Sequence, residues 1–159
     1  MKHQPVLING KGKISIGKGV EIGVINSPFF FNGYAYLEAR KENATIKIGN
    51  NVKINNNFSV VANESEITIE DDVLIGLHCQ IFNADFHNLQ PDQRKSRDYK
   101  SLPIHVEKNV FIGNNVTILK GVTIGENSVI GAGSVVVSSI PKNVIASGNP
   151  AKMIREINH

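Results

Sequence analysis

The chain has 159 residues, of which 19% are charged and 41% hydrophobic, and its formal net charge is +3. This length and balance fit one domain with a buried core, and so small a positive charge argues against a nucleic-acid-binding protein. No apolar stretch approaches the ~20 residues of a transmembrane helix, and the N-terminus lacks the apolar core of a signal peptide. The single cysteine, Cys79, excludes an internal disulfide, so we expect a protein of the reducing cytoplasm.

A β-branched residue recurs every six positions along most of the chain. A period of six fits neither an amphipathic helix nor an alternating strand. It is typical of a parallel β-helix, an all-β fold in which each hexad supplies a short strand and a corner. Three hexads would close one triangular coil. The residues that open the hexads are Ile16, Ile22, Ile48, Ile54, Val60, Ile69, Ile75, Ile81, Val106, Ile112, Ile118, Ile124, Ile130 and Val136.

Two further hexad positions have a recognisable role. The fifth is often Val and should face inward, so Cys79, which occupies it, is expected to be a small buried filler. The fourth is often Gly or Asn, which tolerate a positive φ, and this predicts a left-handed corner. These fourth positions are Gly19, Asn51, Asn57, Asn63, Asn109, Asn115, Gly121, Asn127 and Gly133.

The first interruption of the repeat covers residues 26–47 and is rich in aromatic side chains. We expect this segment to cap the open first coil, because the ends of a solenoid need protection, and to contact substrate as a secondary role. In one domain of residues 1–159, residues 1–47 would then form the cap and a partial coil, and residues 48–141 the regular coils. The aromatic residues are Phe29, Phe30, Phe31, Tyr34 and Tyr36.

The second interruption is a long insert, residues 86–104. A long excursion from a compact domain is usually functional or disordered. His87 stands at its root, where the preceding hexad still holds the backbone, and this is a suitable place for a positioned catalytic group. The insert also contains the basic residues Arg94, Lys95, Arg97 and Lys100, which we expect to meet a phosphorylated small molecule.

The third interruption is the C-terminal segment, residues 142–159. Pro141 and Pro150 stop the repeat, and a short helix is expected from about Ala151. This segment would cap the last coil.

Several motifs together resemble the hexapeptide-repeat acyltransferases, which include galactoside, maltose and surface-polysaccharide O-acetyltransferases. They are Asp85-Phe86-His87, Gly121-Val122-Thr123-Ile124-Gly125, Gly131-Ala132-Gly133 and Gly148-Asn149-Pro150-Ala151-Lys152. The resemblance covers roughly residues 48–157. It implies a left-handed parallel β-helix, acetyl-CoA as the acyl donor, no metal, and a homotrimer with its site between subunits.

The resemblance also implies roles for residues near the acceptor. His87 matches the general base, a role that suits imidazole because it exchanges protons near neutral pH. Asn57 matches an asparagine near the acceptor and the acetyl group, with Asn55 as the alternative. Arg94 matches a basic residue of the acceptor loop. Asp85 and Asp92 would orient His87 or bind sugar hydroxyls, unless they are simply solvated.

For coenzyme A, the resemblance implies two groups of contacts. The backbone around Gly113, Asn114 and Ala132 would line the slot for the pantetheine arm, and Lys152 and Arg155 would meet the nucleotide phosphates. The chain departs from the family pattern at two places. Many relatives have a basic residue where this chain has Ser138, and a proline often follows the histidine where this chain has Asn88.

The resemblance implies O-acetylation of a sugar or sugar-containing acceptor in surface polysaccharide biosynthesis, with N-acetylation of an aminodeoxy-sugar nucleotide as the alternative. Two other classes share the scaffold. A zinc carbonic anhydrase needs three converging histidines, but His78, His87 and His105 are nine and eighteen residues apart and lack that family's close pair. A non-catalytic scaffold would not be expected to retain His87.

Overall fold

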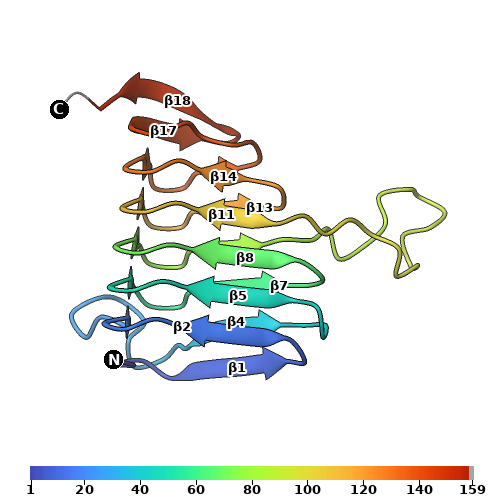
Figure 1. Cartoon of the computed structure of the whole chain (residues 1–159), viewed down its shortest axis with the longest axis horizontal. Coiled ribbons are helices and arrows are strands. Elements are labelled where there is room, and N and C mark those ends of the chain that lie inside the picture. The colour runs from blue at the N-terminus through green and yellow to red at the C-terminus, as the bar shows by residue number, and fades with distance from the viewer. Residues whose placement is uncertain (158–159) are drawn as a thin grey trace.

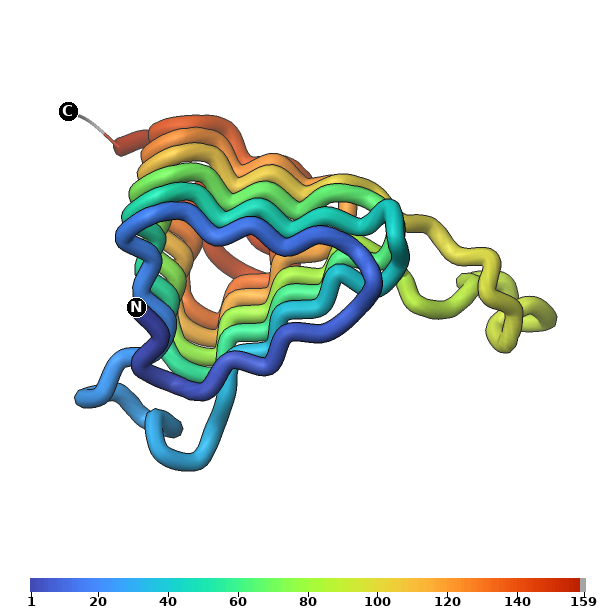
Figure 2. The backbone as a smooth tube through the Cα atoms, turned by 60° about the horizontal axis from the view of Figure 1, so that its bottom comes forward, coloured from blue at the N-terminus to red at the C-terminus, as the bar shows by residue number. Residues whose placement is uncertain are grey.

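The protein, seen here as a computed structural model that describes residues 1–157, is a triangular prism of β-strands (Figure 1). All neighbouring strands are parallel except the last pair. Viewed from the N-terminal end, the chain turns counterclockwise as it recedes, so the β-helix is left-handed (Figure 2). The expected fold class is therefore confirmed.

Three sheets form the faces of the prism. The first sheet contains β1 (Val6–Gly10), β4 (Ala35–Ala39), β7 (Ser59–Ala62), β10 (Gln80–Phe82), β13 (Thr117–Leu119) and β16 (Val135–Val136). The second sheet contains β2 (Lys13–Ile16), β5 (Thr45–Ile48), β8 (Glu66–Ile69), β11 (Ile104–Val106) and β14 (Thr123–Ile124). The third sheet contains β3 (Glu21–Ile22), β6 (Lys53–Ile54), β9 (Leu74–Ile75), β12 (Phe111–Ile112), β15 (Val129–Ile130), β17 (Val144–Gly148) and β18 (Ala151–Glu156).

The interior of the prism is filled by the β-branched residues of the repeat. Equivalent residues of successive coils stack in register, as Ile54, Ile75, Ile112 and Ile130 do in the third sheet, and each is buried. Stacked Ile and Val side chains pack well because their branched Cβ atoms fit a pleated surface. Cys79 is buried as expected, and burial raises the pKa of its thiol to about 11.

The corners of the coils confirm the prediction for the fourth hexad position, with one exception. Asn51, Asn57 and Asn115 have φ values of 56°, 58° and 57°, and Gly133 has φ 73°. Asn63 does not have a positive φ. At its corner the backbone N–H of Asn63 donates instead to the side-chain oxygen of Asn83 at 2.8 Å.

The N-terminal segment differs from the prediction. Residues 1–22 form a complete coil, with β1, β2 and β3 each paired to the next coil, and not a partial one. The aromatic residues 29–34 belong to a loop, residues 23–34, that leaves the side of the prism and does not cover the open first coil (Figure 2). Phe31 in this loop is 88% exposed.

Residues 142–157 of the C-terminal segment contain no helix, which corrects the expectation for the residues after Ala151. Gly148, at φ 110°, and Pro150 reverse the chain, and β18 returns antiparallel to β17. This hairpin satisfies backbone groups at the end of the third sheet that a helix would leave unpaired. Within residues 1–157, no helix is long and apolar enough to cross a membrane.

Asn56 ties the aromatic loop to the prism. Its side chain is fully buried and hydrogen-bonds the backbone of Val24, Ser27 and Pro28 at 2.8–3.2 Å. Asn56→Ala should leave these backbone groups without partners and lower the free energy of unfolding by ~1–3 kcal/mol, measured by denaturant titration. Asn43→Ala, at an exposed turn, is the matched control, and equal losses in the two variants would contradict this role for Asn56.

Candidate functional site

The residues expected to form the site lie at two different corners of the prism. Asn57, Gly113, Asn114 and Ala132 lie where the chain passes from the third sheet to the first, and we call this edge the Asn57 corner. His87 lies in the insert, which runs from residue 83 to 103 between β10 and β11, where the first sheet passes to the second. The insert and the aromatic loop leave from opposite ends of the first sheet (Figure 2). One chain therefore does not bring His87 to the Asn57 corner.

The ring of His87 is oriented by the backbone of its own insert. Phe86 turns the chain with φ 61°, and His87 Nδ1 lies 3.1 Å from the carbonyl oxygen of Arg94. Because a carbonyl only accepts, Nδ1 is the protonated nitrogen, and Nε2 keeps its lone pair. The residue is exposed, and within residues 1–157 its ring is hydrogen-bonded through Nδ1 and not through Nε2. This is the arrangement that a general base requires.

Within residues 1–157, the hydrogen-bond partner of the His87 ring is the Arg94 carbonyl and not an aspartate. The carboxylate of Asp85 accepts from the Lys120 ammonium group, with which it forms an ion pair. Asp92 is exposed in the insert, as is Arg94, the source of the orienting carbonyl.

Asn88 fixes the insert where relatives often have proline. Its amide nitrogen donates to the carbonyl of Asp98 at 2.6 Å, and its amide oxygen accepts the N–H of Gln90 at 2.9 Å. The two arms of the insert are thereby joined just beyond His87. Where a proline ring would restrict the backbone, Asn88 thus holds the insert by hydrogen bonds from its side chain to the backbone.

Asn57 is held by residues that the sequence did not indicate. Its backbone N–H donates to the side-chain oxygen of Gln4 at 3.0 Å, and its side-chain oxygen faces the Gln4 amide nitrogen at 3.4 Å. Its amide nitrogen lies 2.8 Å from His78 Nε2. With the amide in this orientation His78 Nε2 is an acceptor, so the Asn57 side chain has a fixed direction.

His78 differs from the expected exposed corner residue. It is at a corner, with φ 56°, but it is half-buried, and its ring lies against Phe29 with centroids 4.6 Å apart. Neither Gln4 nor Phe29 belongs to the repeat, which is why periodicity did not reveal this cluster. The signal in the sequence that could have indicated this cluster was the aromatic segment itself, which interrupts the repeat between β3 and β4.

The residues expected to line a pantetheine slot follow one another along the Asn57 corner. Asn114 and Ala132 are exposed, whereas Gly113 is buried. A Cβ on Gly113 would lie 2.7 Å from the Ala132 nitrogen, so the close approach that requires glycine is that of the next coil. Lys152 and Arg155 both lie on β18, exposed at the end of the third sheet.

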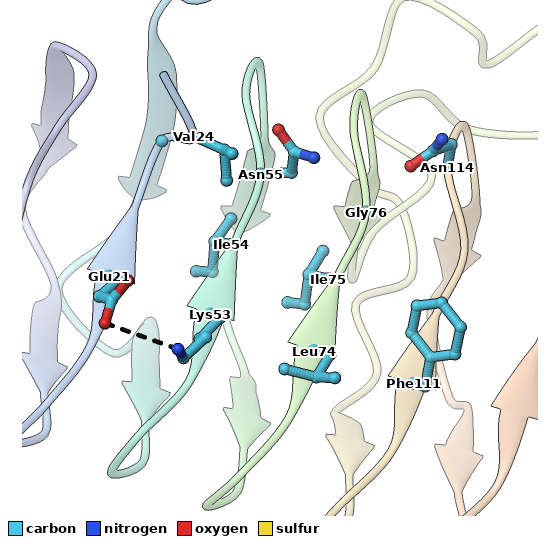
Figure 3. Close-up of a pocket in the computed structure, with 11 residues that line it drawn as sticks. Glu21, Val24, Lys53, Ile54, Asn55, Leu74, Ile75, Gly76, Phe111 and Asn114 are labelled. Atoms are coloured by element: carbon cyan, nitrogen blue, oxygen red, sulfur yellow. Dashed lines mark ion pairs between the residues drawn. The ribbon is translucent and has the colours of Figure 1, made fainter. Parts of the chain in front are cut away.

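A shallow groove runs along the outer face of the third sheet beside this corner (Figure 3). Leu74 and Phe111 form its apolar part and are 44% and 46% exposed. Asn55 and Asn114 lie along one edge of it, on either side of Gly76, and Glu21 faces Lys53 at 3.7 Å (Figure 3). Asn55 thus opens onto this groove, whereas Asn57 lies in the corner with His78.

The histidines considered for a zinc site lie at three separate places. His78 is at the Asn57 corner and His87 in the insert, while His105 lies within β11, where its Nε2 is 2.6 Å from Glu70. Among residues 1–157, no group of three or more His, Cys, Asp or Glu side chains is arranged to hold a metal.

Comparison with known sequences agrees with the fold and the repeat. The family described as bacterial transferase hexapeptide (six repeats) matches residues 103–138. The galactoside O-acetyltransferase of Escherichia coli K12 is 44% identical over 91 residues, which are 57% of this chain and 44% of that protein. The chain therefore spans less than half the length of this relative.

Solved structures similar to this chain also include acyltransferases. A hexapeptide-repeat acetyltransferase of Vibrio cholerae, solved with acetyl coenzyme A, is 28% identical, covers 100% of this chain and 71% of its own, and has a TM-score of 0.58. An N-acyltransferase of Bacillus cereus, at 24% identity, covers 99% and 83% with a TM-score of 0.75, and shows the shared fold. The resemblance to the hexapeptide-repeat acyltransferases is thus confirmed.

Proposed function

We propose that the protein is an acetyltransferase that moves the acetyl group of acetyl-CoA to a hydroxyl of a sugar or sugar-containing acceptor. The observation that carries this proposal is the orientation of the exposed His87, whose Nδ1 is 3.1 Å from the Arg94 carbonyl, so that Nε2 is the nitrogen left to accept a proton. In such a reaction Nε2 takes the proton of the acceptor hydroxyl as its oxygen attacks the thioester carbonyl. The intermediate then collapses, and the thiolate of coenzyme A leaves.

The proposal includes a homotrimer, because the site is complete only if a second copy supplies one of its two halves. His87 and Asn57 lie at opposite ends of the first sheet. In a cyclic trimer with heterologous contacts, the insert of one subunit can approach the Asn57 corner of the next. Each of the three sites would then combine His87 of one subunit with the Asn57 corner of its neighbour.

The outer faces of the sheets support this assembly. On the third sheet, the outward row begins with the charged residues Glu21 and Lys53 and continues as an apolar row of Leu74, Phe111, Val129 and Ile145. On the second sheet, the corresponding row is Lys47, Thr68, His105 and Thr123, which is polar. An alternating strand exposes its outward residues to whatever covers the sheet. The apolar row is therefore suited to contact with another subunit, and the polar row to solvent.

The test of the proposed function is a transfer assay with acetyl-CoA and a panel of nucleotide sugars and oligosaccharides. Release of the free thiol reports turnover, and mass spectrometry of the acceptor gives the added mass. Mild alkaline hydrolysis before the mass measurement distinguishes an ester, which is cleaved, from an amide, which is not. Thiol release that depends on a sugar acceptor supports the proposal. Binding of acetyl-CoA without transfer to any member of the panel would contradict it and would favour an acceptor of another class.

Coenzyme A binding gives an independent prediction. Lys152 and Arg155 are exposed cations on β18, and we expect both to face the phosphates of coenzyme A. The double variant Lys152→Ala, Arg155→Ala should weaken binding of coenzyme A about tenfold or more, as measured by calorimetry, because two charge-assisted contacts are lost. If the 3′-phosphate is the group bound, the loss should be smaller for dephospho-CoA. Equal losses for the two ligands would refute that assignment, and unchanged binding would refute both contacts.

A further inference from the structure

A cavity of about 550 Å³ lies directly beside His87 and is lined almost entirely by cations and aromatic rings. Its cationic side chains come from two places in the sequence. Arg40 and Lys41 follow β4 on the prism, whereas Arg94, Lys95 and Arg97 come from the insert. Among residues 1–157, no aspartate or glutamate lines this cavity.

The charges of the cavity are only partly neutralised by the rest of the protein. Arg40 pairs with Glu38 and Lys41 with Glu64. Within the described residues 1–157, Arg94, Lys95 and Arg97 have no carboxylate within 4.0 Å. Three unneutralised cations therefore surround the space next to the candidate general base, and their mutual repulsion is relieved when an anion enters.

The side of the cavity formed by the prism is rigidly built. Two nitrogens of Arg40 donate to the Glu38 carboxylate at 2.9 Å and 2.8 Å, and Glu38 is buried and accepts a third hydrogen bond from Tyr36 at 3.1 Å. The hydrogen bonds from Arg40 lower the pKa of Glu38, so this pair stays charged. The Arg40 guanidinium also stacks on the Phe86 ring, 4.7 Å from its centroid.

The side formed by the insert is anchored to the prism at both ends. The Phe86 ring packs edge-on against Phe82, with centroids 6.1 Å apart. At the far end, the Tyr99 hydroxyl donates to the Asn63 side chain at 3.3 Å. These contacts hold the basic segment Arg94–Arg97 over the cavity without using its charged groups.

We infer that this cavity binds an anionic group of the acceptor, a phosphate or a carboxylate, next to the hydroxyl that His87 deprotonates. The inference rests on the proposed function and narrows its acceptor from any sugar to a phosphorylated or acidic one. Guanidinium groups favour both anions, because their planar fork matches the two oxygens. The cavity and His87 belong to the same chain, so their proximity does not depend on how subunits assemble.

The phosphates of acetyl-CoA are a poor alternative for this cavity. The thioester must reach the acceptor oxygen beside His87 for the reaction to occur, and the whole pantetheine arm separates that thioester from the phosphates. An anion that binds in contact with His87 therefore belongs to the molecule that carries the attacking hydroxyl.

The experiment compares matched acceptors with the same purified protein. A neutral sugar, its 1-phosphate, its nucleoside-diphosphate derivative and the corresponding uronic acid are each assayed with acetyl-CoA, for the wild type and for the double variant Lys95→Gln, Arg97→Gln. Lys18→Gln, an exposed lysine at a distant corner, is the matched control. We expect the wild type to prefer the anionic forms, and the phosphate and carboxylate arms show which anion it selects.

In the double variant, the KM for the preferred anionic acceptor should rise about tenfold, while kcat and the Kd of coenzyme A stay unchanged. A neutral sugar that is used as well as its anionic forms would overturn the inference and leave the proposed function intact. Weaker binding of coenzyme A in the double variant, with no change for the acceptor, would overturn it by assigning the cavity to coenzyme A. Transfer to none of these acceptors by the wild type would overturn the proposed function, and the inference with it.

Discussion

His87→Ala is expected to lower turnover ~10²–10⁴-fold, the usual cost of removing a general base. The physical reason is the arrangement of the ring, whose Nδ1 faces the Arg94 carbonyl and whose Nε2 is the free acceptor. Removing it leaves no other side chain positioned by the same carbonyl to take the hydroxyl proton. The rate is measured by thiol release at saturating acetyl-CoA with the acceptor identified in the panel.

The oligomer mass, the thermal transition and the affinity for coenzyme A should all be retained by His87→Ala, because the side chain is exposed and packs against no core residue. His105→Ala is the control. That histidine lies on the polar face of the second sheet beside Glu70, so its loss should leave most of the activity. Near-normal turnover by His87→Ala would refute the role of His87 as general base. A general loss of folding would instead show that His87 stabilises the insert.

The second large effect is the recovery of activity when two inactive variants are mixed. Asn57→Ala should be inactive or nearly so, because it removes the polar group at the corner opposite the base, and His87→Ala should be inactive for the reason above. If each site combines His87 of one subunit with Asn57 of its neighbour, a mixed trimer contains sites with both native residues. Random mixing in equal amounts should therefore restore about a quarter of wild-type activity.

The measurement is activity after the two variants are unfolded together and refolded, with light scattering to give the mass of the product. Mixing the two folded variants without subunit exchange is the control and should restore nothing. No recovery from a refolded trimer would place both residues in the site of a single subunit, contrary to the separation of the two corners. A monomer mass at working concentration would overturn the shared site altogether.

The sequence alone was sufficient to predict the β-helix fold and the place where the insert leaves it. A period of six favours one arrangement, in which the Ile and Val residues that open the hexads point inward; all of them except Ile16 in the first coil are buried, and each turn of the coil repeats the same local contacts. The corner asparagines and the buried Cys79 followed from that period, and so did the insert after β10, in which His87 lies five residues beyond the strand. Such features depend on residues close in sequence or one coil apart, so the pattern carries them directly.

The tertiary structure decided everything that lies outside the repeat. The hairpin of β17 and β18 replaced a helix because an open sheet end offered backbone partners to the returning chain. The contact of Asn57 with His78 and Gln4, and of Arg40 with Phe86, joins segments with no common period. His87 and Asn57 are separated because one follows the first sheet and the other precedes it. Their distance therefore depends on the closed triangular coil and not on local spacing in the sequence. These arrangements depend on contacts between distant, non-repeating segments, and such contacts form only when the whole coil is folded.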